Sequence, residues 1–333
     1  MSAMPPRAGH PPAAARDADA VVVDGLVKRF DRTTALAGVS FSVRTGELFG
    51  FIGPDGGGKT TLLRILTTLL LPGAGTARVL GEDVVKGMWT LRPRIGYMPG
   101  RFSLYPDLTI EENLRFFAAV FGTTVDREYE QIQSIYSQIA AFKNRRAGAL
   151  SGGMKQKLAL CCALVHRPEI LFLDEPTTGV DAVSRREFWD LLGRLKATGL
   201  TIIVSTPYMD EATRCDRVAL IQRGRLLALD TPEAIVQSFD RPLIAVRATD
   251  RYRALLALRD YANTHTIYPF GEVLHYTDKR QGAGAEQVAG ELAAFLKARG
   301  FGDLPAEAIP ATIEDSFMAY MGAPEGDQQE GAA

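Results

Sequence analysis

The chain has 333 residues, of which 46% are hydrophobic and 23% charged, and its formal net charge is −1. This composition predicts a folded globular protein, and the length favours one large domain with a smaller appendage. A chain without excess positive charge has no general attraction for nucleic acid, so no nucleic-acid partner is expected.

The first 19 residues lack the apolar core of a signal peptide, and we expect disordered tails at 1–19 and 323–333. No apolar run in the sequence approaches the roughly 18–20 residues that cross a bilayer. Cys161, Cys162 and Cys215 are too few for a disulfide framework and predict a reducing, cytoplasmic compartment. The four histidines are scattered and predict no metal site of their own.

Short apolar runs along the chain predict strands that are buried on both faces. They cover 21–26, 47–53, 169–174 and 200–205. Helical patterns lie between them, and the one at 110–121 starts with a possible capping box of Thr109 and Glu112. This alternation predicts an α/β domain with a largely parallel sheet.

Two further regions depart from this alternation. The stretch from about 100 to 166 is mostly helical, and we interpret it as a helical lobe inserted between strands of a domain over 20–240. Beyond residue 240 a strand, a helix, a polar β-like stretch and a second helix follow one another. They predict a small α+β accessory domain over 241–322.

The strongest motif is GPDGGGKT, Gly53 to Thr60, which matches G-x-x-x-x-G-K-[ST] between a strand and a helix. In such a loop the glycines let backbone N–H groups surround phosphates. Lys59 reaches the β- and γ-phosphates, and the hydroxyl of Thr60 can bind Mg²⁺. The sequence therefore predicts a nucleotide-binding loop.

Two other motifs supply polar groups. EILFLDEP, 169–176, ends a strand in Asp174 and Glu175, which suit a metal ligand and a base for an attacking water. Two acids after a strand could instead cap the next helix. LSGGMKQ, 150–156, opens a helix at Ser151 and exposes N–H groups at its positive end, which favours an anion.

GPDGGGKTT, LSGGMKQ and LFLDEPTTGVD in this order resemble the nucleotide-binding subunit of an ATP-binding cassette (ABC) transporter over roughly 20–240. LSGGMKQ, STPYMDEA and IEDSFMAYM resemble the ATPases of ABC-2-type exporters. The resemblance implies a P-loop fold with a mostly parallel core sheet, an antiparallel β subdomain and an inserted helical lobe. It also implies a head-to-tail dimer, in which each ATP lies between one chain's phosphate loop and the other chain's LSGG.

Carried over by position, the resemblance implies a catalytic role for Lys59, Asp174 and Glu175, and Mg²⁺ binding by Thr60 and Asp174. The residues it implies for ATP binding are Phe30, Gly53, Pro54, Asp55, Gly56, Gly57, Gly58, Lys59, Thr60, Thr61, Ser151, Gly152, Gly153 and Asp181. Phe30 would stack on adenine, although a lone Phe after a strand is usually a core residue. The segment Phe102 to Asn113 resembles the surface on which such ATPases dock membrane partners.

Two positions depart from the family pattern. Gly100 replaces a glutamine that helps to position Mg²⁺ and water, and Pro207 replaces a histidine that contacts the γ-phosphate. Neither residue offers a polar side chain, and proline also lacks a backbone N–H. Since both fall on this chain's own nucleotide site, we expect a slow site here and a faster one on a different cassette. A homodimer that tolerates both changes is the alternative.

The resemblance implies an ATP-hydrolysing subunit that powers efflux through separate ABC-2-type permease subunits. Such a subunit would be peripheral on the inner face of the cell membrane. A soluble ABC ATPase acting on ribosomes or nucleic acid is the alternative, but its relatives usually carry two cassettes or long coiled-coil insertions. A P-loop kinase has no reason to contain LSGGMKQ. The sequence does not show what is transported.

Overall fold

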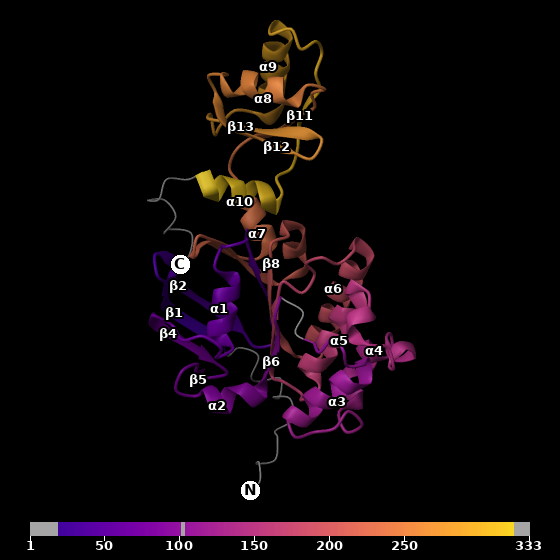
Figure 1. Cartoon of the computed structure of the whole chain (residues 1–333). Helices are drawn as coiled ribbons and strands as arrows, with labels where there is room; N and C mark the ends of the chain where they lie inside the picture. Colours follow the sequence, from indigo (N-terminus) through magenta and orange to yellow (C-terminus); the bar gives the residue numbers. More distant parts are fainter. Residues whose placement is uncertain (1–18, 101–103, 323–333) are drawn as a thin grey trace. The chain divides into compact units, whose positions relative to one another are not determined.

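The computed structural model describes residues 19–100 and 104–322 (Figure 1). They fall into two compact units, one extending to Pro232 and the other starting at Glu233. This division lies a few residues before the predicted domain boundary at 240/241. The predicted tails at 1–19 and 323–333 lie outside the described residues, apart from Asp19, which begins the first strand.

The first unit is built on a six-stranded sheet in the order β10-β9-β3-β8-β7-β6. Its strands are β3 (Leu48–Ile52), β6 (Ile95–Met98), β7 (Ile170–Asp174), β8 (Thr201–Thr206), β9 (Arg217–Gln222) and β10 (Arg225–Asp230). All neighbours pair in parallel except β10 and β9. Every residue of β3, β7 and β8 is buried, as the apolar runs predict for strands covered on both faces.

A second, antiparallel sheet has the order β2-β1-β4-β5. It comprises β1 (Asp19–Phe30), β2 (Thr33–Arg44), β4 (Ala74–Val79) and β5 (Glu82–Asp83). The prediction that 21–26 is a strand buried on both faces is wrong, because β1 alternates between buried and exposed residues and Val22 is 42% exposed. A valine on the solvent face makes a half-buried strand look fully apolar in the sequence.

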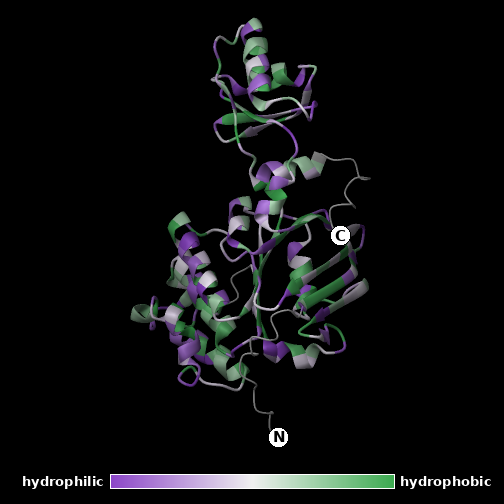
Figure 2. Cartoon of the chain, turned by 180° about the vertical axis from the view of Figure 1, so that it is seen from behind, coloured by the Kyte–Doolittle hydropathy of each residue, from purple (hydrophilic) through white to green (hydrophobic). Residues whose placement is uncertain are grey.

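The helices of the first unit cover the sheets and form the lobe. They are α1 (Lys59–Leu66), α2 (Met88–Leu91), α3 (Ile110–Val120), α4 (Tyr129–Tyr136), α5 (Gly152–Leu164) and α6 (Ala182–Ala197). The capping box of α3 is confirmed, since the Thr109 hydroxyl accepts from Glu112 N and the Glu112 carboxylate accepts from Thr109 N. The lobe helices carry both hydrophobic and hydrophilic residues (Figure 2). Helices α3 and α4 bury one face each, whereas residues 160–164 of α5 are all buried.

The second unit contains α7 (Pro232–Gln237) for most of its length, and then the order β11, α8, β12, β13, α9, β14, α10. The bounds are β11 (Leu243–Val246), α8 (Arg251–Arg259), β12 (Thr264–Phe270), β13 (Val273–Asp278), α9 (Ala285–Ala298), β14 (Ala306–Ala308) and α10 (Ile313–Gly322). The antiparallel sheet has the order β12-β13-β11-β14. This is the β-α-β-β-α-β arrangement of ferredoxin-like domains.

The buried side chains of the second unit form their own core. Ile244, Val246, Leu274 and Tyr276 of the sheet pack with Leu258 and residues of α9. None of the helices among the described residues of either unit is long and apolar enough to cross a bilayer. Cys161, Cys162 and Cys215 are buried and unpaired, and burial raises the pKa of all three thiols, which makes them packing residues.

Candidate functional site

The loop between β3 and α1 requires glycine at several positions. A Cβ on Gly53 would lie 2.0 Å from the Ile221 carbonyl oxygen, and one on Gly58 would lie 2.5 Å from the carbonyl oxygen of Ala35. Gly56 has a φ of +76° but faces open space. The two ends of the loop, at Gly53 and Gly58, therefore pack tightly against neighbouring backbone. The middle of the loop, at Gly56, is open, so its backbone can approach a ligand.

Lys59, the first residue of α1, is only 2% exposed. Its ammonium group donates to the carbonyl oxygens of Gly53 (2.7 Å) and Pro54 (3.0 Å), and it lies 3.2 Å from the Glu175 carboxylate. These three partners match the three donors of the ammonium group. The structure thus holds Lys59 inside the loop and brings it to the carboxylate predicted to act as the base.

Asp174 ends β7 and is 2% exposed. Its Oδ1 accepts hydrogen bonds from the hydroxyls of Thr60 (3.0 Å) and Ser205 (2.7 Å). Thr60 and Asp174 are 114 residues apart in the sequence, so the fold creates this pair. A hydroxyl and a carboxylate side by side next to a phosphate loop are the oxygen ligands that Mg²⁺ prefers. The two residues present therefore fit the predicted cation.

Glu175 has a left-handed backbone, with a φ of +50°. Its N–H donates to the carbonyl oxygen of Ser205 (3.0 Å) and lies 3.1 Å from the Ser205 hydroxyl. Ser205 thus fixes both members of the acidic pair, and our sequence reasoning missed it. Ser205 is opposite Asp174 because β7 and β8 are parallel neighbours, and no local sequence pattern gives this strand order.

The LSGG motif, at the start of α5, contacts the start of α6. Ser151 caps α5 by accepting from Met154 N (3.3 Å), and a Cβ on Gly153 would meet the Ser184 hydroxyl at 2.6 Å. Asp181 caps α6, and hydrogen bonds from the Ser184 and Val183 N–H groups lower the pKa of its carboxyl. Among the described residues, none of the contacts of Ser151 or Gly153 is with the phosphate loop. Ser151 and Gly152 are exposed, whereas Leu150 and Gly153 are buried.

Phe30 lies at the end of β1 and is 44% exposed, so it is not the core residue that a Phe after a strand usually is. The Lys28 ammonium lies 5.2 Å from the centre of its ring. The β1–β2 hairpin reaches the phosphate loop, since Ala35 closes on Gly58. An exposed aromatic ring beside this loop suits stacking on a planar base.

The two departures lie at the same site. A Cβ on Gly100 would stand 2.9 Å from the Asp174 carbonyl oxygen and 3.7 Å from Glu175 Cβ. Pro207 follows Thr206, whose carbonyl oxygen accepts from Gly53 N at 3.3 Å. Both positions therefore adjoin the acidic pair or the loop. A polar cavity of about 310 Å³ lies between Gly100 and the start of α5.

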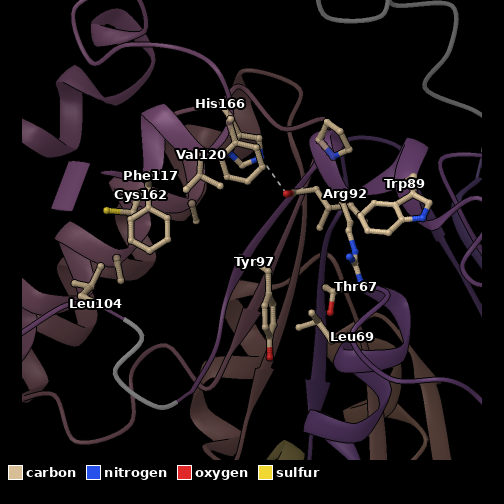
Figure 3. A pocket seen from close by; sticks show the side chains of 15 residues that line it. Thr67, Leu69, Trp89, Arg92, Tyr97, Leu104, Phe117, Val120, Cys162 and His166 are labelled. Carbon is tan, nitrogen blue, oxygen red and sulfur yellow. Dashed lines mark hydrogen bonds between the residues drawn. The ribbon is translucent and has the colours of Figure 1, made fainter. Parts of the chain in front are cut away.

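A larger, mostly apolar groove of about 540 Å³ separates the sheet from the lobe (Figure 3). One wall is formed by Trp89, Arg92 and Tyr97, and the other by Phe117, Val120 and Cys162. Trp89 is 71% exposed, and the Arg92 guanidinium covers its ring at 4.8 Å. Leu104, from the segment predicted to dock membrane partners, also lines the groove; residues 101–103 lie outside the described residues.

Comparison with known proteins gives consistent results. A family model described as "ABC transporter" matches residues 36–178. The Nod factor export ATP-binding protein I of Rhizobium sp. (strain N33) is 35% identical over 308 residues, which are 91% of this chain and 97% of that protein. The probable multidrug ABC transporter ATP-binding protein YbhF of Escherichia coli (strain K12) is 43% identical over 210 residues. That match covers 62% of this chain but only 36% of YbhF, so the chain spans about a third of that relative.

Solved structures of ATP-binding cassettes match about two thirds of the chain. CbiO1 from Clostridium perfringens, part of the ABC transporter complex cbiONQ, has a TM-score of 0.60 at 26% identity. The match covers 66% of this chain and 91% of that chain. An ATP-binding cassette titled MJ0796, bound to ADP and Pi as a dimer, is 24% identical with a TM-score of 0.57 and shows the shared fold. The predicted P-loop fold with its antiparallel subdomain and helical lobe is confirmed.

Proposed function

Because the chain belongs to the family of ABC transporter ATP-binding proteins, we propose that it hydrolyses ATP to drive efflux through separate membrane permeases. One observation carries the proposal: the fold brings Lys59 to Glu175 and Thr60 to Asp174 around an open glycine loop. Relatives named for Nod factor and multidrug export favour efflux over the alternative of a ribosome or nucleic-acid ATPase.

In this proposal each residue of the site has one task. The loop N–H groups and Lys59 bind the phosphates of ATP, with Lys59 exchanging the Gly53 and Pro54 carbonyls for phosphate oxygens. Glu175, freed from Lys59, orients a water and accepts its proton as the γ-phosphate is transferred, giving ADP and phosphate. Mg²⁺ held by Thr60 and Asp174 would neutralise charge on the phosphate oxygens. Phe30 stacks on the adenine.

We further propose a dimer in which Ser151, Gly152 and Gly153 bind the nucleotide of a second cassette. The start of α5 supports this, because Ser151 and Gly152 are exposed there and N–H groups at a helix N-terminus attract an anion. Asp181, at the start of α6, would lie at the same interface. Since Gly100 and Pro207 leave the chain's own site without two polar side chains, we infer a heterodimer with a faster companion. A homodimer is the second candidate.

The groove of Figure 3 is the proposed docking site for the permease. Its lining is mostly apolar and includes the exposed Trp89 and, from the segment predicted to dock membrane partners, Leu104. A groove of this kind accepts one face of a short amphipathic helix, so we assign it to a cytoplasmic helix of an ABC-2-type permease. In this proposal the subunit is peripheral on the inner face of the cell membrane.

The test compares ATP binding, hydrolysis and assembly. The full chain should bind Mg–ATP, and Lys59→Ala should lose this binding. Glu175→Gln should keep binding but lower hydrolysis roughly 100-fold or more and trap an ATP-bound dimer. Mixing with a companion cassette should raise turnover well above that of the chain alone. Full-rate hydrolysis by the chain alone would reject the heterodimer, and a failure to bind ATP would reject the function.

A further inference from the structure

Glu211 is a buried carboxylate for which the proposed mechanism has no task. It lies in a short 3-10 turn, Met209–Arg214, shortly after Pro207, and its side chain is 3% exposed. Its Oε2 accepts hydrogen bonds from the hydroxyls of Thr206 (2.6 Å) and Thr177 (3.1 Å). Such a carboxylate is costly to bury, so its position needs an explanation.

The two threonines belong to the two segments that carry the site. Thr177 lies in the turn directly after Glu175, and the amide of Thr178 closes that turn on the Glu175 carbonyl oxygen at 3.2 Å. Thr206 ends β8 next to Ser205, which holds Asp174 and Glu175. Its carbonyl oxygen also accepts from Gly53 N. Through one oxygen, Glu211 therefore joins the catalytic turn to the strand end that supports the phosphate loop.

The second oxygen of Glu211 is not satisfied in the same way. Oε1 is buried and has no hydrogen-bond partner within the part of the chain that the structure describes. The Arg185 Nε lies 3.8 Å away, while Arg185 Nη2 donates to Asp210 at 3.0 Å. Among the residues that the structure describes, Oε1 is thus held only by the ion pair with Arg185, and both hydrogen bonds of the Glu211 carboxylate go to the two threonines. The contacts that fix this carboxylate are therefore those to the two segments of the site.

We propose that Glu211 is a positioning residue for hydrolysis at this chain's own nucleotide site. It clamps the turn after Glu175 against β8 and so fixes the base in a site that has no side-chain donor at 100 or 207. The contact acts through Thr177 and Thr206, and Glu211 does not touch the nucleotide. This inference rests on the proposed ATPase function and gives a task to the glutamate of STPYMDEA, which the proposed mechanism does not use.

Three variants of the full chain test the clamp. Glu211→Ala removes both hydrogen bonds and should lower kcat roughly ten- to a hundredfold, with the KM for ATP and its binding constant changed less than about twofold. Thr177→Val removes one of the two bonds and should lower kcat by a smaller factor. Glu211→Gln is the matched control, because its carbonyl oxygen still accepts from both threonines, and it should stay within about threefold of the unaltered chain.

Hydrogen exchange tests the same clamp without any need for turnover. Glu211→Ala should increase deuterium uptake in peptides covering 174–181 and leave those covering 53–60 unchanged. The inference is overturned if folded Glu211→Ala keeps kcat and exchange at the original level, or if affinity and kcat fall together. If the unaltered chain binds no Mg–ATP, the proposed function itself has failed, whereas normal binding with an unaffected Glu211→Ala variant rejects the clamp alone.

Discussion

Each unit of the chain contains a buried aspartate, and the two are bonded very differently. Asp315, at the start of α10, is 1% exposed, and both of its oxygens are used. Oδ1 accepts from His275 (2.6 Å) and Tyr268 (2.5 Å), and Oδ2 accepts from the N–H and hydroxyl of Thr312. Asp174, in the first unit, is as deeply buried, but its two described hydrogen bonds both end on Oδ1.

The difference in hydrogen bonding distinguishes a structural carboxylate, Asp315, from one that can bind a cation, Asp174. Four donors from β12, β13 and the residue before α10 fix α10 to its sheet through Asp315. For Asp174, both donors are hydroxyls next to the phosphate loop, and among the described residues no hydrogen bond to Oδ2 is found. Burial alone would not distinguish the two residues. The distribution of donors over the two oxygens does, together with the position of Asp174 beside Thr60 of the phosphate loop.

The largest expected effect tests the ligand role of Asp174. Asp174→Asn should lower hydrolysis about 100-fold or more, because an amide is a weaker ligand for Mg²⁺ and lacks the negative charge. The free energy of unfolding should change by less than about 1 kcal/mol, since the amide oxygen still accepts from Thr60 and Ser205. Steady-state ATPase assays and urea unfolding measure the two quantities. A large decrease in the free energy of unfolding would show that Asp174, like Asp315, has a structural role.

The next largest effect is expected from restoring a hydrogen-bond donor at position 207 or 100 of the nucleotide site. Pro207→His should raise hydrolysis roughly 10- to 150-fold, because a hydrogen bond to a charged group is worth about 1.5–3 kcal/mol. Pro207→Ala is the control for removing the ring alone and should give no comparable gain. Gly100→Gln should gain less, because its Cβ would lie 2.9 Å from the Asp174 carbonyl oxygen. Unchanged turnover in Pro207→His would show that the missing histidine does not limit this site.

The smallest effect tests the structural role of Asp315. Burial raises the pKa of Asp315, but hydrogen bonds from His275, Thr312 and Tyr268 outweigh it and lower the pKa from 3.8 to about 2. Because the folded-state pKa is the lower one, the stabilisation of about 2 kcal/mol is present above pH 4 and is lost as the pH falls toward 2. Asp315→Asn should remove this pH-dependent stabilisation without changing the rate of ATP hydrolysis.

Thermal unfolding of the unaltered chain and of Asp315→Asn between pH 2 and 7 measures this effect. The difference between their unfolding temperatures should become smaller as the pH falls. Asp303→Asn is the matched control, because the Asp303 side chain is 85% exposed in its pair with Lys297. A surface pair of this kind contributes little, so that variant should unfold like the unaltered chain. A constant difference across the pH range would contradict the assignment.

Local sequence patterns predicted the main features of the first unit for physical reasons. The runs at 47–53, 169–174 and 200–205 are apolar because the strands are covered on both faces, and the glycines of the phosphate loop are required by close backbone contacts. Strand β2 was not predicted, because its partly exposed residues give no continuous apolar run. The polar stretch 264–277 is the β12–β13 hairpin.

Contacts between distant residues were harder to predict. Ser205 meets Asp174 only because β7 and β8 are parallel neighbours, and Glu211 meets Thr177 across 34 residues. No local pattern encodes such pairs, since they depend on the order of strands in the sheet. The roles of Ser151 and Asp181 toward a second cassette remain predictions, because their partners belong to another chain.

The left-handed backbone of Glu175 opposes catalytic activity to thermal stability. A left-handed conformation costs a residue such as glutamate on the order of 1 kcal/mol, whereas asparagine and glycine adopt it more easily. The chain would thus fold with less strain if this position carried a residue unable to do the chemistry. Selection for heat resistance alone therefore favours replacing the base, as it does at the other non-glycine residues with positive φ, and an active thermostable form has to gain its stability elsewhere.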